Sequence, residues 1–459
     1  MSQIISEEVR SKTFFNHLNQ LSLYYPIETV ENFLLSIKVK PFLILSGSSG
    51  TGKTKLAQAY GKYISQKTEE YITVETEVTL RKLDKNKGAT IRAENFFDEL
   101  PYDGRRADGI YKVKLGDLES ECTLNLSPRL WFRPNLELFV EEINKLKNQG
   151  KEKEKLLLYI PKNDDSGPNY EIIPVGSNWT ESRFILGYKN VLTGKYTSTK
   201  ALDLIVKSNR NPFEKYLLVL DEMNLSHVER YFSEFLSAME SGECIQLDSD
   251  GSDIPKSIDI GENLIVVGTV NMDETTYAFS PKVLDRANVI EFQPVPVSLA
   301  LGSSGSDNYA PAGDIGYLED PQNGFEVRRM NAAAIRNELC SVPGNKVIVD
   351  EFIADLEQMQ SILSKINLSF GFRTIDEIFR FMYVSWKYMH GGEFTAWKRF
   401  FDAQIKQKIL PKIHGNLSIK EALDSLLTLC SAKGYATSAS KLKTMVDSLE
   451  KQRYVSFNS

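Results

Sequence analysis

Apolar and polar positions along the chain follow the order typical of a protein that alternates strands with helices. Continuous apolar runs at 41–45, 216–220 and 264–270 predict strands buried on both faces, because such strands carry few polar side chains. Apolar residues at helical spacing follow the first two runs, over 53–60 and 228–239. Strands that alternate with helices form parallel sheets covered by helices. The pattern therefore predicts an α/β fold with a parallel sheet flanked by helices.

The spacing of apolar residues also divides the chain into segments of different character. Residues 1–35 carry apolar residues at helical spacing but are too few to form a core of their own. Residues 36–300 contain the predicted sheet, and 71–170 within them mix strand-like and helix-like stretches, which we interpret as an insertion. Gly, Ser, Asp and Pro are frequent over 301–322 and predict a flexible linker. Residues 323–459 show helical spacing and predict a C-terminal helical region.

Composition and charge limit the classes of function that fit the chain. Hydrophobic residues make up 42% and charged residues 25%, as in soluble globular proteins. The net charge of −6 offers no overall attraction to nucleic acid or to an anionic membrane. The four cysteines and four histidines are scattered, without the spacing of a zinc or redox site. Without a leader sequence or an apolar run of about 18 residues, the chain is expected to be cytoplasmic, with no membrane partner.

The stretch at 47–54 carries the clearest chemical signal in the chain. It fits the phosphate-loop pattern G-x-x-x-x-G-K-[ST] and lies between a predicted strand and a predicted helix, which argues against an ordinary Gly-rich turn. Backbone N–H groups at such a turn converge on phosphate oxygens, and the helix dipole adds positive potential. The Lys53 ammonium is expected to reach the β- and γ-phosphates, and the Thr54 hydroxyl to bind Mg²⁺. The predicted nucleotide-binding residues are Gly47, Ser48, Ser49, Gly50, Thr51, Gly52, Lys53 and Thr54.

Two further predicted strands end in polar side chains. The run at 216–220 is followed by Asp221 and Glu222, and the run at 264–270 by Asn271. Because ligands bind at the carboxyl ends of the strands in α/β sheets, these residues are expected beside the phosphates. Asp221 would hold Mg²⁺, Glu222 would polarise the attacking water, and Asn271 would sense the γ-phosphate or that water. A strand that merely ends in a polar turn is the alternative, and the phosphate loop makes it less favoured.

Two arginines are further candidates for phosphate contacts. Arg286 follows the third predicted strand and could supply a guanidinium group to a phosphate. Arg373 stands at a helix entrance after a turn of glycine and aromatic residues. As a lone residue, Arg373 would more often be the partner of a surface ion pair.

The motifs together resemble those of the AAA+ family, and within it the McrB branch, the GTPase motor of modification-dependent, type IV restriction systems. The residues that carry this resemblance are GSSGTGKT at 47–54, PVGSNWTESRFILGY at 174–188, LLVLDEMN at 217–224, VGTVNMDETTYAFSPKVLDRA at 267–287 and FGFRTIDEIFRF at 370–381. The resemblance implies a AAA+ P-loop core with a C-terminal α-helical lid. It does not extend to the predicted insertion or to the last sixty or so residues.

The family motifs also imply roles for individual residues of this chain. By position, they imply a catalytic base at Glu222, sensor 1 at Asn271, sensor 2 in the lid at Arg373, and an arginine finger at Arg286 that acts in trans on a neighbouring subunit. The family usually shows a run of arginines before the closing strand, and this chain lacks it. Arg230 is therefore a rival for the finger.

The resemblance implies a homo-oligomeric ring, expected to be a hexamer, with active sites between its subunits. It also implies an McrC-like endonuclease subunit that stimulates hydrolysis, and DNA bound directly or through another subunit. GTP with Mg²⁺ is the substrate that the resemblance favours, although the phosphate motifs fit ATP equally well. Two alternatives are an ATP-driven, MoxR-like protein remodeller and a non-hydrolysing, nucleotide-dependent assembly scaffold. The presence of Lys53, Asp221 and Glu222 argues against a scaffold, which needs no water-activating carboxylate.

Overall fold

The computed structural model of the 459-residue chain divides into two compact units. One comprises residues 1–65, 168–206 and 215–459, and the other 66–167 and 207–214. The residues that the structure describes are 13–65, 71–79, 90–91, 110–116, 118–124, 130–131, 136–161, 167–211, 214–251, 254–272, 277, 279–294, 311–319 and 327–457.

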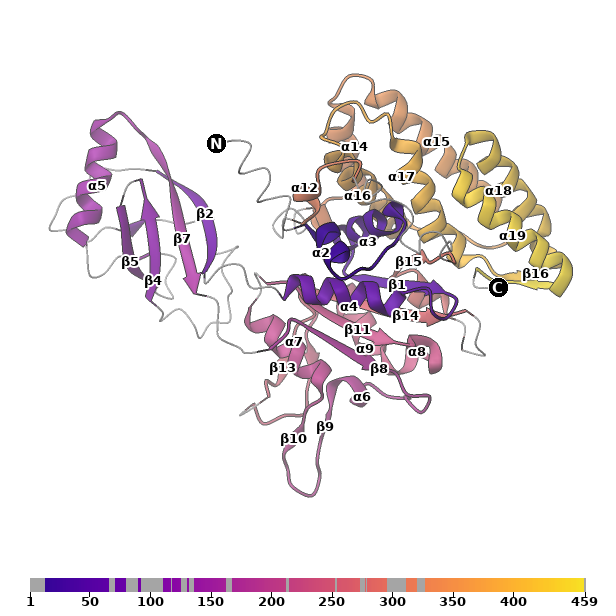
Figure 1. Cartoon of the computed structure of the whole chain (residues 1–459), viewed down its shortest axis with the longest axis horizontal. Helices are drawn as coiled ribbons and strands as arrows, with labels where there is room; N and C mark the ends of the chain where they lie inside the picture. The colour runs from indigo at the N-terminus through magenta and orange to yellow at the C-terminus, as the bar shows by residue number, and fades with distance from the viewer. Residues whose placement is uncertain are drawn as a thin grey trace. The chain divides into compact units, whose positions relative to one another are not determined.

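The first unit is built on a sheet of five parallel strands in the order β15-β1-β14-β11-β8 (Figure 1). The strands are β1 (Phe42–Gly47), β8 (Tyr170–Pro174), β11 (Tyr216–Asp221), β14 (Leu264–Asn271) and β15 (Asn288–Glu291). The central strands β1, β14 and β11 are buried along nearly their whole length, as their continuous apolar runs predict. The predicted α/β fold is therefore confirmed.

Helices cover this sheet. They are α2 (Phe14–Gln20), α3 (Ile27–Val39), α4 (Lys53–Ile64), α6 (Arg183–Leu186), α7 (Lys200–Arg210), α8 (Val228–Tyr231), α9 (Ser233–Ser241) and α10 (Pro281–Leu284). The single helix predicted over 228–239 is in fact two, α8 and α9, which meet at Phe232. The Phe232 ring is fully buried and packs against Phe42 and Phe235, and this burial accompanies the break between the two helices.

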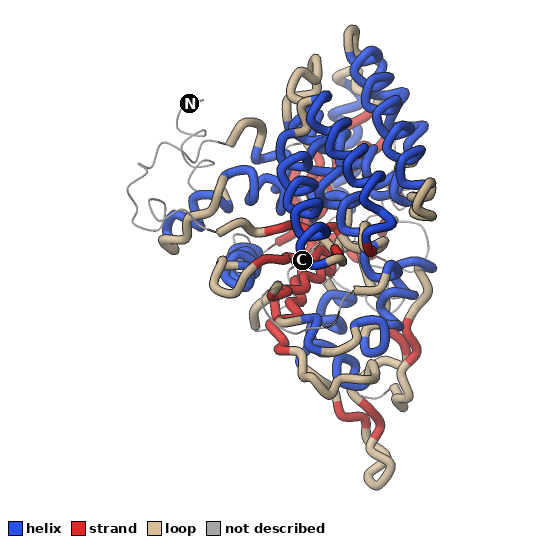
Figure 2. Tube along the Cα trace, turned by 90° about the vertical axis from the view of Figure 1, so that its right-hand side faces the viewer, coloured by secondary structure: helices blue, strands red, loops and turns tan. Residues whose placement is uncertain are grey.

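The C-terminal residues form a helical region that packs on α3 and β15. Figure 1 and Figure 2 show several of its helices lying side by side. They are α12 (Ile315–Glu319), α14 (Ala332–Cys340), α15 (Asn345–Ser364), α16 (Phe372–Tyr388), α17 (Trp397–Gln404), α18 (Lys420–Lys433) and α19 (Ala436–Gln452). Buried aromatic rings, among them Phe352, Phe401 and Tyr435, fill the space between these helices. The prediction of a C-terminal helical region agrees with these elements.

The segment predicted as a flexible linker contains α12. Ile315 and Leu318 are buried, and the Glu319 carboxylate accepts hydrogen bonds from Phe14 N at 2.6 Å and Tyr63 Oη at 2.7 Å. The structure therefore differs from the predicted linker over 311–319, because composition does not reveal that this short helix packs on α3 and α16. The rest of the predicted linker, 301–310 and 320–322, lies outside the described residues.

The second unit consists mainly of the segment that we interpret as an insertion, together with residues 66–70 and the separate stretch 207–214. It contains a six-stranded sheet in the order β2-β7-β4-β5-β6-β3, with antiparallel neighbours. Its elements are β2 (Tyr71–Thr79), β3 (Thr90–Ile91), β4 (Ile110–Leu115), β5 (Leu118–Leu124), β6 (Leu130–Trp131), α5 (Leu136–Asn148) and β7 (Lys153–Pro161). Phe139, Val140 and Ile143 of α5 are buried, and α5 packs against β5.

The first unit also contains three two-stranded ribbons and the short helical turns η1 (Met223–Leu225), η3 (Ile405–Ile409), η4 (Leu410–Lys412) and η5 (Leu417–Ile419). The ribbons pair β9 (Tyr188–Lys189) with β10 (Tyr196–Thr197), β12 (Ile245–Gln246) with β13 (Ser257–Ile258), and β16 (Gly415–Asn416) with β17 (Tyr454–Val455). Within the described ranges of the chain, no helix combines the length and the apolar character needed to cross a membrane.

Candidate functional site

The predicted phosphate loop joins the end of β1 to the start of α4. Gly47 is the last residue of β1, and Lys53 is the first residue of α4. Gly52, just before the helix, has a φ of +88°, and a Cβ atom there would lie 2.9 Å from the Tyr25 ring. Only glycine meets both conditions without strain. Glycine at this position therefore lets the chain turn from the strand into the helix N-terminus.

The Lys53 side chain is held inside this turn. It is buried, and its ammonium group donates hydrogen bonds to the carbonyl oxygens of Gly47 at 2.8 Å and Ser48 at 2.6 Å. The Thr51 hydroxyl donates to the Ser48 carbonyl at 2.8 Å. Ser48, Ser49 and Gly50 form the exposed crest of the loop. The positive charge thus lies within the turn that is predicted to hold phosphates.

The strand order brings the predicted polar residues to one edge of the sheet. Strand β14 lies between β1 and β11, and Asn271 at its end pairs in register with Gly47. Asp221 is the last residue of β11 on the other side of β14. The carboxyl ends of parallel strands meet at the same edge, so the phosphate loop, Asn271 and Asp221 lie together there.

Hydrogen bonds connect these side chains directly. One oxygen of Asp221, Oδ1, accepts hydrogen bonds from the hydroxyl groups of Thr54 at 2.7 Å and Thr269 at 2.6 Å. The Asn271 side-chain amide donates to Glu222 Oε1 at 3.3 Å. Glu222 itself has a left-handed backbone with φ +54°, and its N–H donates to the Thr269 hydroxyl at 3.0 Å. The structure therefore brings Thr54 to Asp221 and Asn271 to Glu222.

The donors at this edge suit Mg²⁺ better than a metal that needs a complete protein cage. Among the described residues, no group of three or more His, Cys, Asp or Glu side chains could hold a metal ion. Mg²⁺ commonly takes one or two protein ligands and completes its octahedron with water and substrate phosphates. Thr54 and Asp221, joined by a hydrogen bond at the mouth of the phosphate loop, fit that description.

Two residues of this edge were not predicted from the sequence. Thr269 is a polar residue within an apolar run, two positions before Asn271 and so on the same face of β14, which is a signal that could have identified it. Tyr25 lies far from the loop in sequence, yet its hydroxyl donates to the Gly52 carbonyl at 2.9 Å. Its ring also packs edge-on against Phe292, which follows β15. No local pattern connects Tyr25 with the loop.

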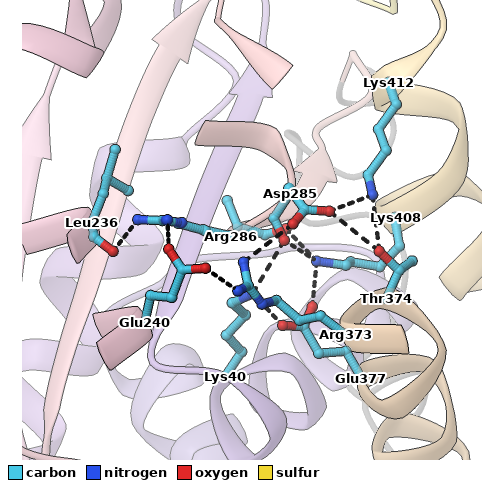
Figure 3. A network of polar contacts seen from close by, with 11 residues as sticks. Lys40, Leu236, Glu240, Asp285, Arg286, Arg373, Thr374, Glu377, Lys408 and Lys412 are labelled. Carbon is cyan, nitrogen blue, oxygen red and sulfur yellow. Dashed lines mark hydrogen bonds and ion pairs between the residues drawn. The ribbon is translucent and has the colours of Figure 1, made fainter. Parts of the chain in front are cut away.

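The two predicted arginines meet at a single carboxylate, that of Glu240 in α9 (Figure 3). Arg286 is buried, donates to the Leu236 carbonyl and forms an ion pair with Glu240. Arg373 is half-buried, pairs with Glu240 and lies 3.3 Å from Asp285. The Arg286 guanidinium thus turns into its own chain, an orientation that does not suit a finger reaching a neighbouring subunit. Its rival Arg230 is exposed on α8.

Close to these arginines, buried and half-buried lysines and carboxylates join the sheet to the helical region (Figure 3). Glu377 of α16 pairs with Lys40, which follows α3, and with Lys408 at 2.5 Å. Asp285 pairs with Lys412 at 2.7 Å. Burial would raise the pKa of the Glu377 carboxyl, but the Lys408 and Lys40 ammonium groups hold it below its usual range. These contacts fix the helical region on the core by charge as well as by apolar packing.

Lys40 gives this junction a pH dependence that can be measured. Burial and the nearby Lys408 ammonium lower its pKa from 10.5 to about 7, although its ion pair with Glu377 and the Asp285 charge act in the opposite direction. The unfolded chain then binds more protons than the folded chain between about pH 7 and pH 10, so the free energy of unfolding rises with pH in that window. The expected result is a smaller rise for Lys40→Met than for the wild type.

The measurement is the melting temperature of both proteins from pH 7 to pH 9.5, at constant ionic strength. Burial also lowers the pKa of Lys412, which faces the same junction, so the test uses the difference between the two pH profiles and not either profile alone. Parallel pH profiles for the two proteins would contradict the lowered pKa of Lys40.

Comparisons with known proteins found a family model that matches the C-terminal part of the chain. Residues 326–454, which hold the helices from α14 to α19, match a domain of unknown function (DUF8727). No curated protein matches the chain. Among solved structures, the chain is similar to the crystal structure of a "putative ATPase" from Cytophaga hutchinsonii. The two chains share 10% sequence identity with a TM-score of 0.39, over 89% of this chain and 91% of the other.

Proposed function

We propose that this chain is a Mg²⁺-dependent nucleoside triphosphatase. One observation carries the proposal: the Thr54 hydroxyl of the phosphate loop donates to Asp221, while Glu222 and Asn271, also in contact, stand at the same edge of the sheet. A phosphate loop alone would support nucleotide binding only. A carboxylate positioned by an amide beside that loop supports hydrolysis, because in-line attack needs a water molecule that is oriented and polarised.

Each residue at this edge of the sheet has a separate role in the proposed reaction. Backbone N–H groups of 47–54 and the Lys53 ammonium hold the phosphates and offset their charge. Glu222 accepts the proton of the attacking water, and its hydrogen bond with Asn271 fixes the direction of the carboxylate. Thr54 and Asp221 would hold Mg²⁺, which would supply positive charge to offset that of the phosphates.

The direct test is phosphate release from the purified chain with GTP and with ATP, in Mg²⁺ and in excess EDTA. We expect Mg²⁺-dependent turnover, with GTP preferred because the motifs resemble those of the McrB branch. Preference for ATP would favour the remodeller alternative. Tight binding without phosphate release, with any candidate nuclease partner present, would contradict hydrolysis and favour the scaffold.

We also propose that the chain acts as the motor of a DNA restriction or phage-defence complex. The motifs at 174–188, 217–224 and 267–287 support a ring of McrB type, expected to be a hexamer, with an McrC-like endonuclease partner. The test is the mass of the complex in solution with and without a non-hydrolysable nucleotide, followed by DNA cleavage after the endonuclease is added. A chain that stays monomeric at micromolar concentration with nucleotide would contradict the ring.

If the ring forms, mixing variants identifies the arginine that acts in trans. Because Arg230 is exposed and Arg286 is paired within its own chain, we expect Arg230 to be the finger. Arg230→Ala subunits have an intact Glu222, and Glu222→Gln subunits have an intact finger. Mixing these two inactive proteins is expected to restore part of the turnover, because a complete active site then forms between unlike subunits.

Arg286→Ala mixed with Glu222→Gln is the matched comparison. We expect no restoration from this pair, because Arg286 stabilises its own subunit through Glu240 and Leu236. Restoration by the Arg286 variant and not by the Arg230 variant would reverse the assignment.

A further inference from the structure

We infer that Thr269 is a positioning residue that holds Asp221 and Glu222 in the geometry needed for hydrolysis. The inference rests on the proposed function, and it assigns a role to a side chain in the middle of the sheet.

The Thr269 hydroxyl joins the two acidic residues. It donates to Asp221 Oδ1 at 2.6 Å and accepts from the Glu222 N–H at 3.0 Å. The residue is 2% exposed, so water does not compete for these bonds. Because the hydroxyl has a single hydrogen and uses it on Asp221, its orientation is set by both partners at once. A shift of either acidic residue would break a buried hydrogen bond.

The backbone of Glu222 needs such support. Its φ of +54° lies in the left-handed region, which is uncommon for a residue other than glycine and persists only where surrounding contacts enforce it. The bond from the Glu222 N–H to Thr269 acts at this residue directly. Without it, the turn would relax, and the Glu222 carboxylate would leave its position beside Asn271.

The neighbouring glycine of β14 accommodates the same turn. A Cβ atom on Gly268 would lie 2.3 Å from the sulfur of Met223, the residue after Glu222. Met223 is fully buried, and the space over Gly268 is where its side chain packs. Gly268 and Thr269 together therefore act as a template for residues 221–223: one leaves room for Met223, and the other binds the residues before it.

The Thr269 bond also affects the predicted magnesium pair. Thr269 and Thr54 both donate to Oδ1 of Asp221, which fixes the rotation of that carboxylate. Since the Thr54 hydroxyl spends its hydrogen on Asp221, its lone pairs remain available for a cation. Without the Thr269 hydroxyl, Asp221 Oδ1 would keep only the hydrogen bond from Thr54. The Asp221 carboxylate could then rotate more freely, and Thr54 and Asp221 would bind Mg²⁺ less tightly.

The test compares Thr269→Val, which keeps the shape but removes the hydroxyl, with Thr269→Ser, which keeps the hydroxyl. For the valine variant we expect turnover to fall about 10- to 100-fold, as is typical when a partner that orients a metal ligand is removed. The Mg²⁺ concentration for half-maximal turnover is expected to rise, with little change in the KM for nucleotide. The serine variant is expected to recover most of the wild-type rate.

A second readout does not require hydrolysis. Binding of a fluorescent, non-hydrolysable nucleotide is titrated with Mg²⁺, and Thr269→Val is expected to need more Mg²⁺ than the wild type or Thr269→Ser. If the wild type shows this Mg²⁺-dependent binding but no turnover, the proposed hydrolysis fails while the role of Thr269 in positioning Asp221 is still measured.

Ser385→Ala is the control for loss of a buried hydroxyl. Ser385 is fully buried in α16, and its hydroxyl has no hydrogen-bond partner among the described residues, so this variant is expected to match the wild type in both readouts. Wild-type Mg²⁺ dependence in Thr269→Val would overturn the inference. Equal losses in the valine and serine variants, with lowered melting temperatures, would also overturn it, because packing alone would then explain them.

Discussion

Replacing Glu222 by glutamine is expected to lower the rate of phosphate release by about 10²- to 10⁴-fold, the usual contribution of a general base. Glutamine has nearly the same shape as glutamate and keeps an oxygen that can accept the hydrogen bond of Asn271. It cannot accept a proton from water at neutral pH. The change therefore removes the proposed chemistry and leaves the contacts of the turn largely in place.

Nucleotide affinity separates loss of chemistry from loss of the site. Because the phosphate loop and Asp221 are unchanged, Glu222→Gln is expected to bind fluorescent GTP or ATP as tightly as the wild type. The matched control is Glu243→Gln, an exposed glutamate after α9, which is expected to retain full turnover. Hydrolysis by Glu222→Gln at the rate of the control would rule out Glu222 as the base and move the role to another group.

Replacing Glu377 by alanine is expected to lower the free energy of unfolding by about 3–5 kcal/mol, as happens when one partner of a buried ion pair is removed. The Glu377 side chain is 6% exposed and lies between Lys40 and Lys408, and Lys408 is fully buried. Without the carboxylate, the buried Lys408 ammonium keeps only carbonyl oxygens as partners, and Lys40, whose pKa is already lowered to about 7, loses its ion pair and is driven toward its neutral form. The lost interactions lie where α16 packs on α3, so the helical region is expected to be held less firmly on the core.

Urea unfolding followed by tryptophan fluorescence measures this effect, since Trp386 and Trp397 lie in the helical region. Glu450→Gln, in an exposed ion pair with Lys420, is the control and is expected to leave the unfolding midpoint nearly unchanged. The triple change of Glu377, Lys40 and Lys408 to methionine tests the cause. It is expected to recover much of the loss, because no unpaired charge then remains buried. A triple variant as unstable as Glu377→Ala would contradict this explanation.

Local sequence patterns were sufficient to predict the central strands of the sheet and part of the candidate site. The strands β1, β11 and β14 lie where their apolar runs are, because a strand covered on both faces can hardly contain polar residues. The rule that ligands gather at the carboxyl ends of parallel strands then anticipated that Thr54, Asp221, Glu222 and Asn271 would meet. Their hydrogen bonds agree with that expectation.

Contacts between distant segments were not predictable in this way. The hydrogen bond from Tyr25 to the phosphate loop and those of Thr269 with the two acidic residues depend on which strands and segments become neighbours in the fold. No short motif contains that information. The orientation of the Arg286 side chain could not be predicted from the sequence either. The motif marks a guanidinium near the phosphates, but Glu240 of α9 and the Leu236 carbonyl decide where it points. A charged side chain pairs with the opposite charge that the fold brings close to it, and the local sequence does not specify which residue that is.

The parallel sheet, the phosphate loop and the polar residues at the strand ends could be predicted from the sequence, because each depends on periodicity or spacing within a few residues. The contacts that hold those residues in place become visible only in the folded chain. The fold supplies Thr269 for Asp221 and Glu222, Glu240 for the two arginines, and Glu377 for the lysines beneath the helical region. The physical reason is that hydrogen bonds and buried ion pairs act over a few ångströms in space, whatever the distance along the chain.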